Sequence, residues 1–239
     1  MAYKYLLIER GERLVKLVLN RPRVHNALHA PLLRELKAAL KELGHDEACA
    51  VVLLAGRGKA FSVGVAKDDH RAQEMMAEVT AGVEALEKPV IAVGHGLAVG
   101  AGLELALACD FIIAAEQAFL ADDSASSGRL PAGGLSQKLP RLIGSFKAKE
   151  VLLAGQPLPA LEARCLGLVN EVVDEEGLEA ASLDLAQRLL SLDQRVVGRL
   201  KLLINQGLKL DLERALLLER IESLHSQHQL EGPALYHHH

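Results

Sequence analysis

The sequence predicts an α/β fold, in which buried parallel strands alternate with helices. Segment 50–55 (AVVLLA) is entirely apolar, which is typical of a strand that a parallel sheet buries on both faces. Segment 30–43 places leucine and alanine at helical spacing. The order of strand and helix then repeats as far as residue 115, which favours a parallel sheet with right-handed crossovers. Of the 239 residues, 50% are hydrophobic, so the chain can build about one large core.

The expected elements follow one another closely. Segments 5–9 and 14–19 are rich in Leu, Ile and Val on either side of Gly11, and they predict a β-hairpin that ends at Asn20-Arg21-Pro22. The elements expected next are a helix at 30–43, a strand at 50–55, a helix at 71–87, a strand at 90–93, a helix at 104–108 and a strand at 110–115.

The pattern changes after Glu116. Segment 121–134 is rich in Ser, Gly and Asp and predicts a loop, and the chain from Leu135 onward is mostly helical in pattern. Segments 195–206 and 210–229 are long and rich in leucine. The second carries more apolar side chains than one helix needs against its own domain. We therefore expect this part to pack against the body and against neighbouring subunits, with a helical cap inside one domain as the alternative.

Composition argues against several classes of function. The net charge is −4, so no basic surface for nucleic acid is expected. Four Phe, three Tyr and no Trp would make a poor platform for stacking bases. No apolar run reaches the roughly 18 residues of a membrane helix, and residues 1–10 lack the apolar run of a signal peptide. We therefore expect a cytoplasmic protein with neither a nucleic-acid nor a membrane partner.

The cysteines and the last residues indicate neither a disulfide nor a metal site. Cys49, Cys109 and Cys165 lie far apart and form no CxxC pair, which predicts buried thiols in a reducing compartment rather than disulfides. No cluster of His, Cys and carboxylates has the spacing of metal ligands, so no metal is expected. Residues 237–239 are three histidines and are interpreted as a purification-tag remnant.

Two glycine-containing turns follow buried strands, at 59–65 and 94–104. Residues 94–102 hold four glycines, and Gly100 and Gly102 open a helix. The first N–H groups of a helix have no partner inside it and can stabilise negative charge. If the first turn presents another free N–H opposite, the pair forms an oxyanion hole. Glycines before a helix that serve only for close packing are the alternative. The spacing is not a dinucleotide-binding fingerprint, because no acidic ribose-binding residue follows a second strand.

Together these motifs resemble the enoyl-CoA hydratase/isomerase (crotonase) family. The similar segments are 19–36 (LNRPRVHNALHAPLLREL), 51–65, 87–116 (EKPVIAVGHGLAVGAGLELALACDFIIAAE), 130–144, 148–173 and 231–236 (EGPALY). The resemblance implies a crotonase-like spiral of ββα units at 1–180 and a C-terminal helical trimerisation region at 181–236. It also implies an acyl-CoA thioester as ligand, no cofactor beyond that coenzyme A, and a homo-oligomer that is a trimer or a dimer of trimers.

The resemblance assigns roles to individual residues. The two main-chain donors of the oxyanion hole fall on Val65 and Ala101, beside Gly100. The adenine and pantetheine side of coenzyme A is expected along Arg23, Val24, Ala27 and Val63. Lys67 is a further candidate cation for a phosphate, as is Arg23, and an ordinary surface charge is the alternative for both.

Glu104 matches the first of the two catalytic glutamates of the hydratases. It lies one turn into the helix that Gly100 opens, and partial burial would raise its pKa toward acid–base work. A helix-capping role is the alternative. The second glutamate is missing, because its position holds Ser124, whose hydroxyl is a poor proton reservoir. Asp122 or Asp123 could replace it if the loop backbone shifts.

Three further positions depart from or refine the family pattern. Ala66 replaces an aspartate that often follows the first oxyanion residue. His95 is expected to form a structural hydrogen bond, and His70 to lie exposed at a helix start. A substrate-side role for His70 is the alternative, because segment 64–70 resembles cyclohexadiene-carbonyl-CoA hydratases.

These features predict a lyase of acyl-CoA metabolism that adds water reversibly to an enoyl-CoA or a dienoyl-CoA through a thioester enolate. A single-glutamate relative that acts as isomerase, thioester hydrolase or decarboxylase is the second hypothesis, and a non-catalytic acyl-CoA-binding protein is the third.

Overall fold

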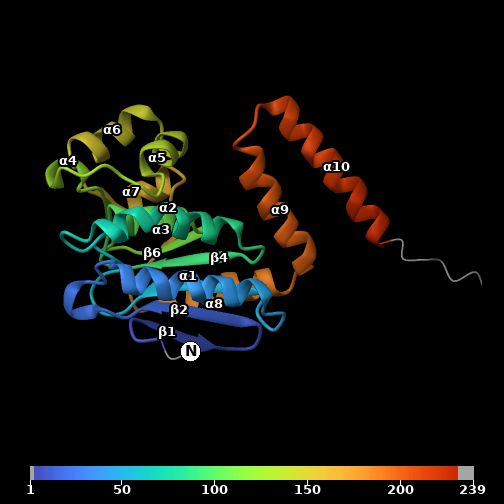
Figure 1. Cartoon of the computed structure of the whole chain (residues 1–239), viewed down its shortest axis with the longest axis horizontal. Helices are drawn as coiled ribbons and strands as arrows, with labels where there is room; N and C mark the ends of the chain where they lie inside the picture. Colours follow the sequence, from blue (N-terminus) through green and yellow to red (C-terminus); the bar gives the residue numbers. More distant parts are fainter. Residues whose placement is uncertain (1–2, 231–239) are drawn as a thin grey trace, which may run out of the picture.

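The computed structural model describes residues 3–230 and shows a mixed α/β architecture (Figure 1). The main sheet has six strands in the order β1-β2-β3-β4-β6-β9, and a smaller sheet has three in the order β5-β7-β8. β1 is antiparallel to β2, and every other neighbouring pair of the main sheet is parallel. The α/β class predicted from the sequence is therefore confirmed.

The strands are β1 (Leu6–Arg10), β2 (Leu14–Leu19), β3 (Val51–Gly56), β4 (Val90–Gly94), β5 (Leu97–Val99), β6 (Phe111–Ala115), β7 (Phe119–Ala121), β8 (Leu158–Pro159) and β9 (Glu171–Val173). The helices are the short 3-10 helix η1 (Pro22–Val24), α1 (Ala30–His45), α2 (His70–Ala85), α3 (Ala101–Leu107), α4 (Ser124–Ser127), α5 (Leu135–Ile143), α6 (Ser145–Leu153), α7 (Ala160–Cys165), α8 (Leu178–Leu190), α9 (Gln194–Gly207) and α10 (Leu212–Leu230).

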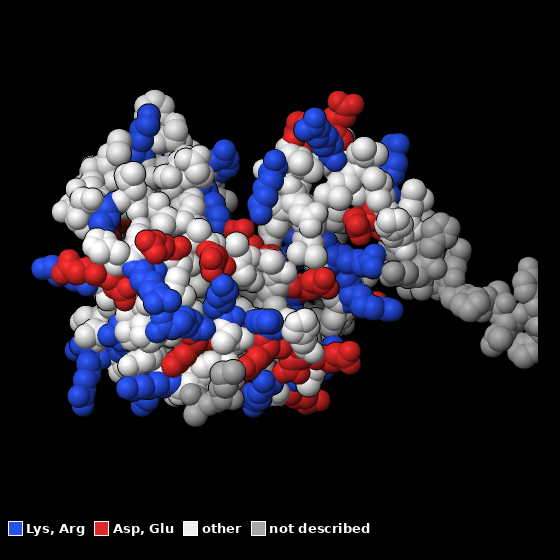
Figure 2. Space-filling model, viewed as in Figure 1, with Lys and Arg blue, Asp and Glu red and all other residues white. Residues whose placement is uncertain are grey.

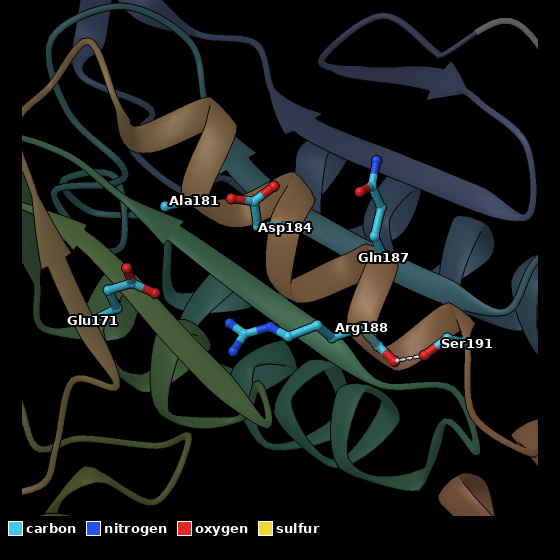
Figure 3. A pocket seen from close by; sticks show the side chains of 6 residues that line it. All are labelled: Glu171, Ala181, Asp184, Gln187, Arg188 and Ser191. Carbon is cyan, nitrogen blue, oxygen red and sulfur yellow. Dashed lines mark hydrogen bonds between the residues drawn. The ribbon is translucent and has the colours of Figure 1, made fainter.

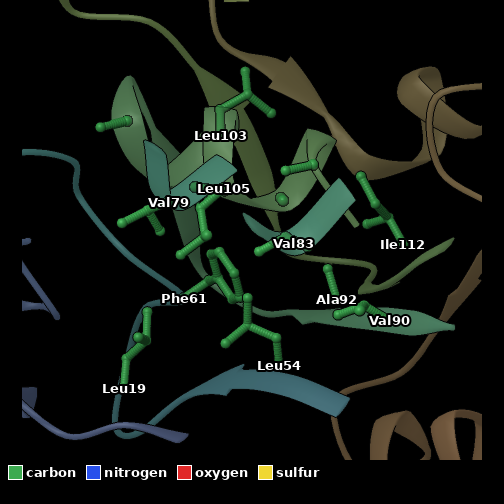
Figure 4. Close-up of a cluster of buried hydrophobic side chains, with 14 of the residues drawn as sticks. Leu19, Leu54, Phe61, Val79, Val83, Val90, Ala92, Leu103, Leu105 and Ile112 are labelled. Atoms are coloured by element: carbon green, nitrogen blue, oxygen red, sulfur yellow. The ribbon is translucent and has the colours of Figure 1, made fainter. Parts of the chain in front are cut away.

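The main sheet is buried on both faces, as β3 shows. Val52 and Leu54 belong to the larger core cluster, together with the apolar faces of α1, α2 and α3. Val51 and Leu53 point the other way, into a second cluster that α8 covers. Figure 4 shows Leu54, Phe61 and Leu105 close together in the larger cluster. The fully apolar sequence of β3 thus follows from helices on both sides.

The predicted elements up to residue 115 are all present, and their ends differ by a few residues at most. The largest difference is α3, which begins at Ala101 rather than 104. Segment 97–99 and segment 119–121 form the three-residue strands β5 and β7, which pair with each other in the smaller sheet. Strands this short carry no recognisable alternation, so the sequence pattern did not predict them.

The C-terminal helices α9 and α10 extend away from the sheet (Figure 1). Lys201 of α9 is buried and forms an ion pair of 2.8 Å with Asp110, which ties this helix to the body. α10 exposes several large apolar side chains: Leu212, Leu216, Leu217, Ile221 and Leu224. The expected division between residues 180 and 181 lies inside α8, which packs on the sheet, so the part that stands apart begins with α9. Segments 231–236 and 237–239 lie outside the described residues.

Charges of both signs are mixed over the lower part of the molecule in Figure 2, whereas the surface over α4 to α6 carries few charged side chains. No helix within residues 3–230 is both long and apolar enough to span a bilayer.

Candidate active site

A turn that follows β3 is held in place by the buried side chain of Asn26. Its Nδ2 donates to the carbonyl oxygens of Ala60 at 2.7 Å and Arg57 at 3.0 Å, and its Oδ1 accepts from the N–H of Arg21 at 2.9 Å. The hydroxyl of Ser62 donates to the carbonyl of Asn26 at 2.9 Å. These hydrogen bonds therefore hold segments 21–28 and 57–66 together next to the site.

A parallel β-bridge between Leu28 and Val65 sets the direction of the next amide. The N–H of Leu28 donates to Gly64 at 2.7 Å, and the N–H of Ala66 donates to Leu28 at 2.7 Å. In such a bridge the residue between these two directs its own N–H to the opposite side. The N–H of Val65 consequently points away from Leu28, and it donates to no acceptor within residues 3–230.

The start of α3 lies directly against this turn. A Cβ built on Gly64 would lie 3.4 Å from the backbone nitrogen of Ala101, and one on Gly102 would lie 2.4 Å from the carbonyl oxygen of Ser62. Glycine at 64 and 102 therefore permits the close approach. Ala101 is the first residue of α3, so its N–H has no partner in the helix, and no other acceptor in the described part of the chain takes it.

The carboxyl group of Glu104 is almost completely buried, at 1% exposure. Its Oε1 accepts from the N–H of Gly133 at 2.7 Å and of Leu135 at 3.2 Å. A Cβ on Gly133 would lie 2.9 Å from Oε2, so glycine is needed there. Both hydrogen bonds thus come from outside α3, and Leu135 is the first residue of α5, so Glu104 holds the start of α5 rather than the start of its own helix. Burial raises the pKa of Glu104, the N–H donors at Leu135 and Gly133 oppose this, and the charge of Asp122 adds to the rise.

The loop after β7 brings a second carboxyl group to the same place. Asp122 is 5% exposed. Its Oδ1 accepts from the hydroxyl of Ser124 at 2.9 Å and its Oδ2 from the N–H of Ser124 at 3.2 Å. Burial raises the pKa of Asp122, whereas the hydrogen bonds from Ser124 lower it. Asp123 is more open, with 42% of its side chain exposed, and it lies 3.7 Å from Nη2 of Arg129.

These groups surround one small cavity of about 20 Å³, which is room for one water molecule. Five of the residues predicted for the site line it: Val65, Gly100, Ala101, Glu104 and Ser124. The other lining residues are Gln73, Asp122, Asp123, Ser127, Arg129, Leu130 and Pro131. No sequence motif marks Gln73, whose Nε2 donates to the carbonyl of Leu130 at 2.7 Å and ties α2 to the loop. Gly133 lies in segment 130–144, which resembles the family, but only the structure shows its contact with Glu104.

Of the residues predicted to bind coenzyme A, Gly100 lines this cavity, whereas Arg23, Val24, Ala27, Val63 and Lys67 do not. Arg23 and Val24 are exposed on η1. Ala27 and Val63 follow on adjoining segments, because the N–H of Val63 donates to His25 at 3.1 Å. Lys67 is exposed two residues after Val65. Neither Arg23 nor Lys67 forms an ion pair with any acidic side chain in residues 3–230, so both cations are available to an anionic ligand.

His95 and His70 both occupy the structural positions that the sequence predicts. Nε2 of His95 lies 2.7 Å from the carbonyl oxygen of Gly58, which is the expected structural hydrogen bond. His70 is the exposed first residue of α2, where Asp69 caps the helix through the N–H of Ala72. Within residues 3–230, no group of three or more His, Cys, Asp or Glu side chains could hold a metal ion.

A larger hollow of about 690 Å³ lies on α8 and β9, far more open than the small cavity (Figure 3). Its lining residues are Glu171, Ala181, Asp184, Gln187, Arg188 and Ser191. The one hydrogen bond drawn there joins the Ser191 hydroxyl to the Arg188 carbonyl at 2.7 Å. All six of these lining residues are exposed or half-buried, so this hollow lacks the buried carboxyl groups that distinguish the small cavity.

Val65 and Ala101, whose N–H groups have no acceptor in residues 3–230, line one cavity with the buried Glu104. In an α/β protein this arrangement is typical of an oxyanion hole, the class of site that stabilises a carbonyl oxygen as it gains charge. The particular family follows from comparison with known proteins. The chain belongs to the enoyl-CoA hydratase/isomerase family, whose model matches residues 9–236. The crotonase-like fold predicted from the sequence is confirmed by close structural matches within this family.

Similar proteins share most of their length with this chain. A probable peroxisomal enoyl-CoA hydratase 1 of Arabidopsis thaliana is 41% identical over 85% of this chain and 79% of its own length. A crotonyl-CoA hydratase of Syntrophomonas wolfei is 37% identical over 92% of this chain and 88% of its own. The crystal structure of an enoyl-CoA hydratase from Bacillus anthracis superposes with a TM-score of 0.89 at 35% identity, and covers 96% of this chain and 94% of that one.

Proposed function

We propose that this protein is an acyl-CoA lyase that adds water reversibly to the C2=C3 double bond of an enoyl-CoA or a dienoyl-CoA. The observation that carries the proposal is the shared cavity, in which the free N–H groups of Val65 and Ala101 lie together with the buried carboxyl group of Glu104. Membership of the enoyl-CoA hydratase/isomerase family supports the choice of a CoA thioester as substrate.

The amides bind the thioester carbonyl oxygen. When water adds to C3, the π electrons of the double bond move toward that oxygen and form an enolate, so negative charge grows between the two N–H donors. A preorganised donor of this kind is worth about 3–4 kcal/mol in the transition state. The enolate then returns its electrons to C2, which takes up a proton, and the net change is one water added across C2 and C3.

Glu104 takes the proton from the attacking water. The N–H groups of Gly133 and Leu135 fix one carboxyl oxygen and favour the ionised form. Burial raises the pKa of the same group, which makes it a stronger base than an exposed glutamate. The small cavity beside it has the size of the one water that the reaction consumes.

The proposal extends to the binding of coenzyme A and to the assembly of several chains. Coenzyme A lies along Arg23, Val24, Ala27 and Val63, with Arg23 or Lys67 at a phosphate. The chain forms a trimer or a dimer of trimers through its C-terminal helices, whose exposed leucines support an interface between copies. The cytoplasmic location stays a prediction, because the similar proteins include a probable peroxisomal hydratase.

The test is hydration of crotonyl-CoA and of a panel of dienoyl-CoA thioesters, followed by the loss of enoyl absorbance and by mass spectrometry of the product. We expect Glu104→Gln to lower kcat by about 10²–10⁴-fold while the acyl-CoA still binds in calorimetry. The exposed Glu116 provides the matched control Glu116→Gln, which should keep full activity. Hydration that survives in Glu104→Gln overturns the mechanism. A shifted double bond or released coenzyme A without hydration would favour the isomerase or hydrolase, and binding without any product would favour a non-catalytic role.

A further inference from the structure

The cavity contains a second buried carboxyl group at a position where the family pattern has none. The register of the sequence places Ser124, not a glutamate, at the second acid–base position. In the structure, Ser124 directs both its hydroxyl and its N–H at the carboxylate of the neighbouring Asp122. Asp122 and Glu104 line the same cavity, and both are at least nine-tenths buried.

We propose that Asp122, positioned by Ser124, supplies the proton that C2 receives, and so replaces the missing second glutamate. This inference rests on the proposed hydratase function and names the proton donor of the same site. Ser124 then acts through Asp122 as a positioning residue rather than as a catalytic one.

The surroundings of the two carboxyl groups suit opposite protonation states. Two like charges in one small buried space disfavour each other, so the pair holds a proton more readily than either group alone. The N–H groups of Gly133 and Leu135 can only donate, which fits an ionised Glu104. Oδ2 of Asp122 also accepts from an N–H, that of Ser124, but its Oδ1 faces the Ser124 hydroxyl, which can accept a hydrogen bond from a protonated carboxyl group. Of the two carboxyl groups, Asp122 is therefore the one with an acceptor beside it for the proton.

Asp123 is the competing candidate, and its surroundings fit the role less well. Its side chain is 42% exposed and lies 3.7 Å from the guanidinium of Arg129, so it is engaged in an ion pair at the surface. A Cβ on Gly100 would lie 2.6 Å from its Oδ1, so Asp123 lies against the start of α3. Asp122, in contrast, is enclosed and is held by Ser124 on both carboxyl oxygens.

In the proposed step, two proton transfers accompany the addition of water. The water oxygen forms a bond to C3 while one of its O–H bonds breaks and gives its proton to Glu104. The π electrons form the enolate, and their return to C2 breaks the O–H bond of Asp122 and forms a C2–H bond. Asp122 is left as the carboxylate and Glu104 as the acid, and a proton passed from Glu104 to Asp122 through water restores the starting state.

The first test compares Asp122→Asn with Asp123→Asn in the hydration assay. We expect kcat to fall by about 10²–10⁴-fold in Asp122→Asn, with acyl-CoA binding retained in calorimetry, and to fall by less than about tenfold in Asp123→Asn. If Asp122→Asn keeps activity within about threefold of the parent, or if Asp123→Asn loses more, the inference is overturned. If only Glu104→Gln loses activity, the proposed hydratase function stands and the role of Asp122 falls. If the parent enzyme itself is inactive, both the hydratase function and the role of Asp122 fall.

The second test separates positioning from mere structure through the pH profile. The Ser124 hydroxyl lowers the pKa of Asp122, so Ser124→Ala should raise it. Because Asp122 must be protonated, the alkaline limb of kcat should move to higher pH in Ser124→Ala. The double variant Asp122→Asn/Ser124→Glu should regain at least tenfold of the activity lost by Asp122→Asn. An unmoved alkaline limb, together with no recovery in the double variant, counts against Asp122.

Discussion

Replacement of the buried Asn26 by Asp tests whether the oxyanion turn depends on the side chain beneath it. The two side chains have the same shape, so the change removes the amide donors without leaving a cavity. Oδ1 can still accept from the N–H of Arg21, but the carbonyl oxygens of Ala60 and Arg57 lose hydrogen bonds of 2.7 and 3.0 Å. Asn26 is 0% exposed, so water cannot replace the donor.

The expected loss follows from those two bonds. A buried acceptor that is left without its donor costs about 1–3 kcal/mol, and of the two carbonyls only that of Ala60 belongs to a buried residue, so Asn26→Asp should lower the free energy of unfolding by at least about 1–3 kcal/mol. The introduced carboxylate would also face two carbonyl oxygens. Since the carbonyl of Asn26 holds Ser62, the amide of Val65 should shift and kcat should fall together with stability.

Urea unfolding at neutral pH measures the first effect and the hydration assay measures the second. Asn170→Asp is the matched control, because Asn170 is exposed and uses only its Oδ1, which accepts from the N–H of Ile112 at 2.8 Å. That variant should change stability by less than about 0.5 kcal/mol. A loss below about 1 kcal/mol in Asn26→Asp would refute the idea that this side chain holds the turn.

Three further outcomes are expected. Gly133→Ala places a Cβ 2.9 Å from Oε2 of Glu104, so it should lower kcat at least tenfold and stability by about 1–3 kcal/mol; Gly11→Ala, with ordinary contacts at 3.7 Å, should do neither. Lys201→Met leaves the half-buried Asp110 without its cation and should cost about 1–3 kcal/mol in thermal or urea unfolding; a loss near zero would show that α9 is held by other contacts. Burial raises the pKa of Glu104, so its ionisation destabilises the fold as pH rises through that pKa. Glu104→Gln should therefore raise Tm more at pH 8 than at pH 5, and an equal change at both would contradict this.

The main sheet could be predicted from the sequence because its signals are local. The apolar run of β3 and the heptad-like leucines of α1 report burial directly, and their bounds agree with the structure to within a few residues. The strands β5 and β7 were not predicted, since three residues carry no period and their pairing joins segments about twenty residues apart. Such strands are fixed by tertiary contacts rather than by local pattern.

The candidate site, like the fold, could be predicted from the sequence only in part. The glycine turns and Glu104 could be found because family motifs mark them along the chain. The N–H partners of Glu104 come from residues 133 and 135, and the sequence does not show that their backbone folds back over α3. The direction of the Asp122 side chain was also beyond the sequence, because it depends on the conformation of a loop with no regular pattern. The predicted register placed Ser124 at the cavity, but it could not show that its hydroxyl serves the aspartate two residues earlier.

The proposed donors at positions 65 and 101 are peptide groups, so no exchange of side chains can delete them. Only a change in the path of the main chain, or an ester in place of the peptide bond, would remove either one. The side chains at these two positions pack in or against the core cluster, so core packing limits which residues can stand there, while the chemistry itself does not depend on them. An engineer who changes this site should leave the glycines that fix the path of the main chain untouched.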